Sequence, residues 1–114
     1  MTYEMKMLVL EGDRCPFEEW YTALRDTRTR ARIRSRLSRV RVGNLGDCKS
    51  VGRNASDLRL DFGPGYRLYF GVAGQAIVVL LGGGDKRTQA RDIAEAQQIW
   101  EESQDAPERF QRDF

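Results

Sequence analysis

Three apolar runs follow one another in the stretch Leu58-Arg59-Leu60-Asp61-Phe62-Gly63-Pro64-Gly65-Tyr66-Arg67-Leu68-Tyr69-Phe70 and its continuation Ile77-Val78-Val79-Leu80-Leu81. Glycine-rich turns separate the runs, so the stretch predicts three consecutive strands. Side chains alternate between the two faces of a strand, which gives each of the first two strands an apolar face and a face with an arginine. The third run is apolar throughout, and this predicts a central strand buried on both faces.

The apolar faces of the first two strands fix how the strands pair. With Leu58 opposite Leu68, Arg59 lies opposite Arg67, whereas a shift by one residue would place apolar side chains against arginines. Two like charges side by side on an open sheet face are mildly destabilising. The pair is therefore either neutralised by the aspartates that flank Arg59 on the same face, or it is an anion site for a phosphodiester.

The remaining elements complete an α+β pattern. We expect a strand over residues 5–10, helices over 16–26 and 28–42, a short strand around 48–51, and a last helix capped by Thr88 or Asp85. This order predicts a small mixed or antiparallel sheet of four to five strands (β-α-α-β-β-β-β-α), packed by an N-terminal helix hairpin and a C-terminal helix. The expected core includes Trp20, Leu37, Leu58, Leu68, Val79 and Ile93. We expect one domain over residues 1–104 and a flexible tail over 105–114.

Charge is distributed unevenly along the chain, although the net charge is only +2. Between Arg25 and Arg53, ten lysines or arginines face two aspartates, and from Arg91 onward seven carboxylates face three arginines. Almost no acidic residue interrupts the arginines of the second helix. The pattern therefore predicts a face that binds RNA or the ribosome, with an ordinary solvated face as the alternative. The side chains expected on it are Arg28, Arg32, Arg36 and Arg39.

The absence of histidine removes the usual general base and the commonest metal ligand. Cys15 and Cys48 lack the spacing of a metal site, and the pair suits a reducing compartment. The sequence contains no apolar run of membrane-spanning length and no signal-peptide pattern at its N-terminus. We therefore expect a cytoplasmic protein with no membrane contact, no metal and no cofactor.

Five motifs occur in a fixed order along the chain. They are Phe17-x-x-Trp20, Arg30-Ala31-Arg32-Ile33, Gly43-Asn44-x-Gly46-Asp47-x-Lys49, Gly63-Pro64-Gly65-Tyr66-Arg67-x-Tyr69-Phe70 and Gly83-Gly84-Asp85-Lys86. Over residues 5 to 100 this set resembles the RelE/ParE superfamily of bacterial toxins, above all its HigB-like branch of addiction-module killer proteins. One departure is Asp57, which stands where that family usually has a glutamate.

The resemblance implies a RelE-like fold and the toxin of a type II toxin-antitoxin system. Such a toxin cleaves mRNA on the ribosome without a metal and is neutralised by a cognate, DNA-binding antitoxin. By position, Arg67 matches the family's arginine that stabilises the phosphate. Arg59 matches a basic residue that acts on the nucleophile or the phosphate. Lys86 matches the basic residue after the last strand, which is a candidate for assisting the leaving group or stabilising charge. Lys49 and Tyr69 are further candidates for RNA binding.

Two other functions are compatible with the pattern. The ParE-like branch of the superfamily inhibits DNA gyrase and needs no catalytic residues, and the cluster of Arg59, Arg67 and Lys86 argues against it. A non-enzymatic RNA- or protein-binding module would use the arginine-rich helix and keep the strands as scaffold.

Overall fold

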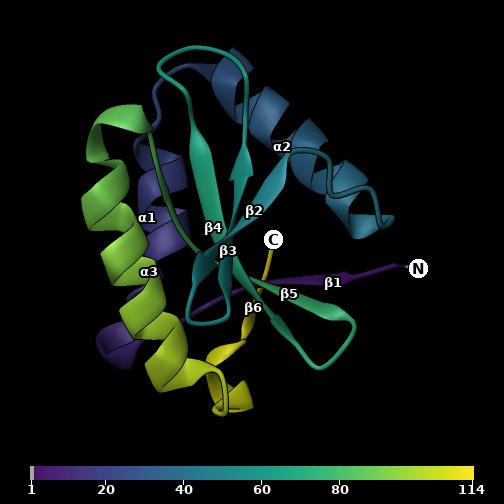
Figure 1. Ribbon diagram of the computed structural model, residues 1–114, viewed down its shortest axis with the longest axis vertical. Helices are drawn as coiled ribbons and strands as arrows, with labels where there is room; N and C mark the ends of the chain where they lie inside the picture. The colour runs from purple at the N-terminus through teal and green to yellow at the C-terminus, as the bar shows by residue number, and fades with distance from the viewer. Residues whose placement is uncertain (1) are drawn as a thin grey trace.

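The protein, described here by a computed structural model over residues 2–114, has helices on both faces of one mixed sheet (Figure 1). The strands are β1 (Glu4–Met7), β2 (Cys48–Gly52), β3 (Ala55–Arg59), β4 (Arg67–Ala73), β5 (Ile77–Gly84) and β6 (Arg112–Asp113). The helices are α1 (Pro16–Ala23), α2 (Thr27–Arg41) and α3 (Gln89–Ser103), with 3-10 turns η1 (Glu11–Asp13), η2 (Lys86–Thr88) and η3 (Pro107–Arg109). The α+β prediction is confirmed. No helix within residues 2–114 is long and apolar enough to cross a membrane.

Over residues 2–114 the sheet has six strands, in the order β2-β3-β4-β5-β1-β6. β1 runs parallel to β5, and the other neighbouring pairs are antiparallel. The apolar strand β5 lies inside the sheet, and its residues 78–81 are at most 1% exposed, as predicted for a central strand. The prediction of four to five strands is wrong by one, because β6 comes from the segment that was expected to be a tail.

The hairpin of β3 and β4 has the predicted register. Leu58 lies opposite Leu68 and Arg59 opposite Arg67, and the Leu60 amide donates to the Tyr66 carbonyl at 3.0 Å. The alternation of apolar and polar side chains therefore determined the pairing correctly.

Both faces of the sheet are covered. On one face, Ile33 and Leu37 of α2 pack in one cluster with Leu58 and Leu68. On the other face, Trp100 of α3 packs with side chains of β4 and β5, and Figure 1 shows α2 and α3 on opposite sides of these strands. The prediction that the arginines lie on an open face is therefore wrong. The apolar stripe of α3 is buried against the sheet face that carries the arginines.

The expected core residues divide into two groups. Leu37, Leu58, Leu68 and Val79 are at most 1% exposed, as predicted. Trp20 and Ile93 pack only partly against the core and remain half-buried, which corrects their assignment.

The last ten residues pack against the rest of the protein. β6 pairs with β1, and the Val9 amide donates to the Arg109 carbonyl at 2.8 Å. The ring of Phe114 lies 5.4 Å from that of Phe17. The prediction of a flexible tail is wrong, because the segment buries the ring of Phe110, packs the partly buried ring of Phe114 against the core, and adds a strand to the sheet.

Candidate functional site

The three predicted catalytic residues come together around one cleft of about 490 Å³. Arg59 ends β3, Arg67 begins β4, and Lys86 follows β5, so three different elements supply them. Asp47 and Asp61 also line the cleft. The sequence predicted this juxtaposition, and the structure contains it.

The loop over residues 60–66 forms one wall of the cleft. Gly63 and Gly65 have φ values of +58° and +79°, a left-handed conformation that glycine adopts without strain. The Lys86 amide donates to the Pro64 carbonyl at 3.4 Å, and the Lys86 stem packs beside Gly65. The tight turn thus brings Lys86 to the arginine-bearing ends of β3 and β4.

A buried carboxylate lies between the two arginines. Asp57 is fully buried, and its Oδ2 is 3.5 Å from Arg59 Nε and 3.7 Å from Arg67 Nη1. Within residues 2–114, Asp57 Oδ1 and the Nε and Nη1 of Arg67 have no hydrogen-bond partner. Asp57 therefore separates the two positive charges, and Arg67 still lines the cleft with the small exposed part of its side chain. An aspartate can therefore neutralise part of the charge of the arginine pair while the pair also forms part of an anion site.

The three catalytic candidates differ in exposure. The Arg67 side chain is 9% exposed and that of Arg59 is 31% exposed, whereas Lys86 lies at the surface. A buried, paired guanidinium is held in place, whereas a surface ammonium is free to follow a substrate. The arrangement offers one fixed cation and two more accessible ones around a single anion.

Two of the predicted RNA-binding side chains, Tyr69 and Arg36, are buried, so the exposed position expected for them is wrong. Tyr69 is 1% exposed beneath α3, and burial, helped by the Asp92 and Asp57 carboxylates, raises the pKa of its phenol to about 12. Arg36 is 8% exposed, donates to the Leu45 carbonyl at 2.6 Å, and has its pKa lowered by burial. Arg36 therefore holds the loop after α2 and contributes only a small exposed surface to the hollow along that helix.

The other predicted RNA-binding residues are exposed. Arg32 and Arg39 line a hollow of about 450 Å³ that continues from the cleft along α2, and Arg28 lines a smaller one of about 270 Å³. The hollow and the cleft share Arg59 and Phe62. Lys49 is exposed on the edge strand β2 and does not line the cleft. A continuous groove therefore joins the arginines of α2 to the catalytic candidates.

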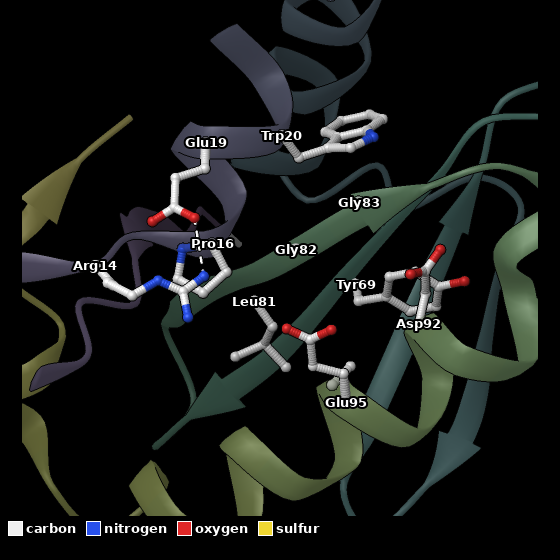
Figure 2. A pocket seen from close by; sticks show the side chains of 11 residues that line it. Arg14, Pro16, Glu19, Trp20, Tyr69, Leu81, Gly82, Gly83, Asp92 and Glu95 are labelled. Atoms are coloured by element: carbon white, nitrogen blue, oxygen red, sulfur yellow. Dashed lines mark hydrogen bonds and ion pairs between the residues drawn. The ribbon is translucent and has the colours of Figure 1, made fainter. Parts of the chain in front are cut away.

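A second cavity, of about 310 Å³, lies between α1 and α3 and is lined along β5 by Gly82 and Gly83 (Figure 2). Its charged lining consists of Glu19, Asp92 and Glu95 against Arg14, which pairs with Glu19 at 2.9 Å. An excess of carboxylates repels a phosphodiester, whereas three cations and two carboxylates line the cleft. The cleft is therefore the candidate anion site.

Comparison with known proteins finds a bacterial relative with a similar sequence. An uncharacterized protein of Haemophilus influenzae is 42% identical over 86 residues, which is 75% of this chain and 87% of that protein. The chain belongs to the same family as that protein. No family model and no solved structure matches the chain. Because the relative carries no described activity, the function has to be argued from the site.

Sequence reasoning missed three residues that shape the cleft: Asp47, Phe62 and Tyr66. Asp47 lies in a loop, where no periodicity indicates its direction. For the two aromatic residues, alternation predicted the apolar face of the sheet. The signal that places them at the cleft is the Gly63-Pro64-Gly65 turn between them, which ends the regular strand and brings the two rings within 5.5 Å.

Proposed function

We propose that this protein is a type II toxin that cleaves mRNA on the ribosome without a metal ion. The observation that carries the proposal is the convergence of Arg59, Arg67 and Lys86 on one cleft. The resemblance to the toxin family points to the same three residues, and three separate elements bring them together. We also propose a RelE-like arrangement of the sheet, a cytoplasmic location and a cognate, DNA-binding antitoxin as partner.

The chemistry that suits this cleft is attack of an RNA 2′-oxygen on the adjacent phosphorus. The bond to the 5′-oxygen breaks, and the products are a 2′,3′-cyclic phosphate and a 5′-hydroxyl. The five-coordinate phosphorus carries more negative charge than the substrate, so fixed cations stabilise it selectively. Guanidinium groups meet phosphate oxygens with two parallel hydrogen bonds.

Each of the three residues has a role that fits its exposure. Arg67, buried against Asp57, is the fixed donor to the phosphorane oxygens. Arg59, at 31% exposure, contacts the phosphate or the nucleophile, and surface-exposed Lys86 stabilises the leaving 5′-oxygen. Because the chain has no histidine, proton transfer falls to Lys86, to a cleft aspartate or to water.

The test is expression in cells followed by mapping of new 5′ ends on mRNA. We expect cuts in frame with codons for the wild type and far fewer for Lys86→Gln. Double-strand DNA breaks without mRNA cuts would instead identify a gyrase inhibitor. Neither kind of damage, together with stable RNA binding, would identify a non-enzymatic binding module.

A further inference from the structure

Phe62 occupies the junction of the groove. It lines the cleft, the hollow along α2 and the smaller hollow at Arg28, and so borders all three. Buried phenylalanines of this protein, such as Phe17 and Phe70, are at most 2% exposed, whereas Phe62 is only half-buried. Part of its ring is therefore accessible at the point where the cationic surfaces meet.

The ring is held in place by its neighbours. The Arg32 guanidinium carbon lies 4.8 Å from the centre of the Phe62 ring, and the Tyr66 ring lies 5.5 Å away at 55°. The loop that carries Phe62 is closed by the hydrogen bond from Leu60 to Tyr66 and by the positive φ of Gly63. Phe62 and Arg32 together form a preorganised pair, which we call the stacking platform.

Aromatic rings and guanidinium planes in a basic groove are the groups on which unpaired bases stack. Bases inside a duplex are already stacked on each other and present only their edges. We propose that the stacking platform binds an unpaired base of the RNA strand whose phosphate occupies the cleft. This inference rests on the proposed function and adds a subsite for a single-stranded nucleotide to it.

The experiment uses the full-length protein and a short single-stranded RNA that contains one 2-aminopurine, moved along the strand in a series. Stacking on the platform should quench its fluorescence at one position in the wild type. Phe62→Leu keeps an apolar side chain but removes the ring, and should lose the quenching. It should also weaken RNA binding roughly 5- to 150-fold, the range that stacking of one base is worth. Phe62→Tyr should restore both.

Matched arginine variants separate the platform from general charge. Arg32→Gln should reduce both quenching and affinity. Arg34→Gln, on the same helix, should retain the quenching, because Arg34 donates to the Tyr21 hydroxyl at 3.2 Å and does not line the groove. Circular dichroism and thermal unfolding check that each variant is folded.

The outcomes distinguish this inference from the function on which it rests. A folded Phe62→Leu protein that binds and quenches like the wild type would overturn the platform but leave the cleft assignment standing. Equal or tighter binding of an RNA or DNA duplex of the same length would also overturn it. If the wild type binds no single-stranded RNA, the platform falls, whereas the proposed function, which concerns mRNA on the ribosome, is decided separately by the mapping of 5′ ends.

Discussion

At the scale of single residues, Asp57 offsets the repulsion between the positive charges of Arg59 and Arg67. Its carboxylate is fully buried and lies within 4 Å of both guanidinium groups. Removing one partner of a buried ion pair lowers stability by more than the intact pair contributes, because the remaining buried charge is left uncompensated. The same reasoning applies to Arg67→Ala, which would leave Asp57 paired only to Arg59. We therefore expect Arg67→Ala to be less stable than the wild type.

We expect Asp57→Asn to lower the free energy of unfolding by about 3 kcal/mol, because the buried Arg67 loses its counter-charge. Urea denaturation measures this, with Asp61→Asn as the control. Asp61 flanks Arg59 on the other side but is exposed, so its neutralisation should cost well under 1 kcal/mol. Equal stabilities of the two variants would show that the buried pair contributes nothing.

Tyr69 should make the protein lose stability at alkaline pH. Its pKa is raised by burial from 10.0 to about 12, so the unfolded chain loses the proton at a lower pH than the folded one. The stabilising contribution is complete below pH 10 and disappears as the pH rises to about 12, by roughly 1–3 kcal/mol. Tyr69→Phe should flatten this part of the stability curve. A difference curve between the two proteins that is level from pH 9 to 12 would contradict the assignment.

At the scale of elements, β4 shows what sequence reasoning can and cannot supply. Period-two alternation gave the strand, its register with β3 and the burial of Leu68, since each depends on local pattern. The same alternation could not show that α3 covers the second face, because that contact joins segments far apart in the chain. Alternation alone therefore predicts Tyr69 at the surface, although its ring belongs to a second core cluster.

Leu68 and Val72 provide a test of this strand. Leu68→Ala should destabilise the protein by about 2–5 kcal/mol, because it opens a cavity in the core between β4 and the helices α1 and α2. Val72→Ala, on the same strand but at a position that is 42% exposed, should cost less than 1 kcal/mol. Chemical denaturation of both variants checks the pair. A cost for Leu68→Ala as small as that for Val72→Ala would mean that the faces are assigned wrongly.

At the scale of the whole molecule, charge is divided between two cavities. The lining of the groove from α2 to the cleft has more cations than carboxylates, whereas the lining of the cavity between α1 and α3 has more carboxylates than cations. Sequence reasoning found the arginine-rich segment and the three catalytic candidates from composition and motif order. It could not tell which arginines serve the fold, because the burial of Arg36 depends on the loop that folds back over α2.

Replacing Arg28, Arg32 and Arg39 together by glutamine should flatten the salt dependence of RNA or ribosome binding. Binding through fewer phosphate contacts releases fewer counterions. Loss of three contacts should therefore reduce the slope of log affinity against log salt concentration by up to about 2 for a single strand. Arg36 is left unchanged because its substitution would disturb the loop. The triple variant Arg25→Gln, Arg34→Gln and Arg53→Gln, at positions outside the groove, removes the same charge. Equal salt dependence of binding in the two triple variants would show that the α2 arginines form an ordinary solvated face.

The central claim is that the cleft holds the scissile phosphate, and neighbouring cations on η2 test it most directly. Lys86 lines the cleft, whereas Arg87 is 83% exposed, pairs with Asp85 and lies outside the cleft. The measurement is the cleavage rate of ribosome-bound mRNA by purified wild type, Lys86→Gln and Arg87→Gln, with circular dichroism confirming the fold of each. We predict a rate about 10²–10³ lower for Lys86→Gln and a nearly unchanged rate for Arg87→Gln. A folded Lys86→Gln protein that cuts at the wild-type rate would contradict the claim.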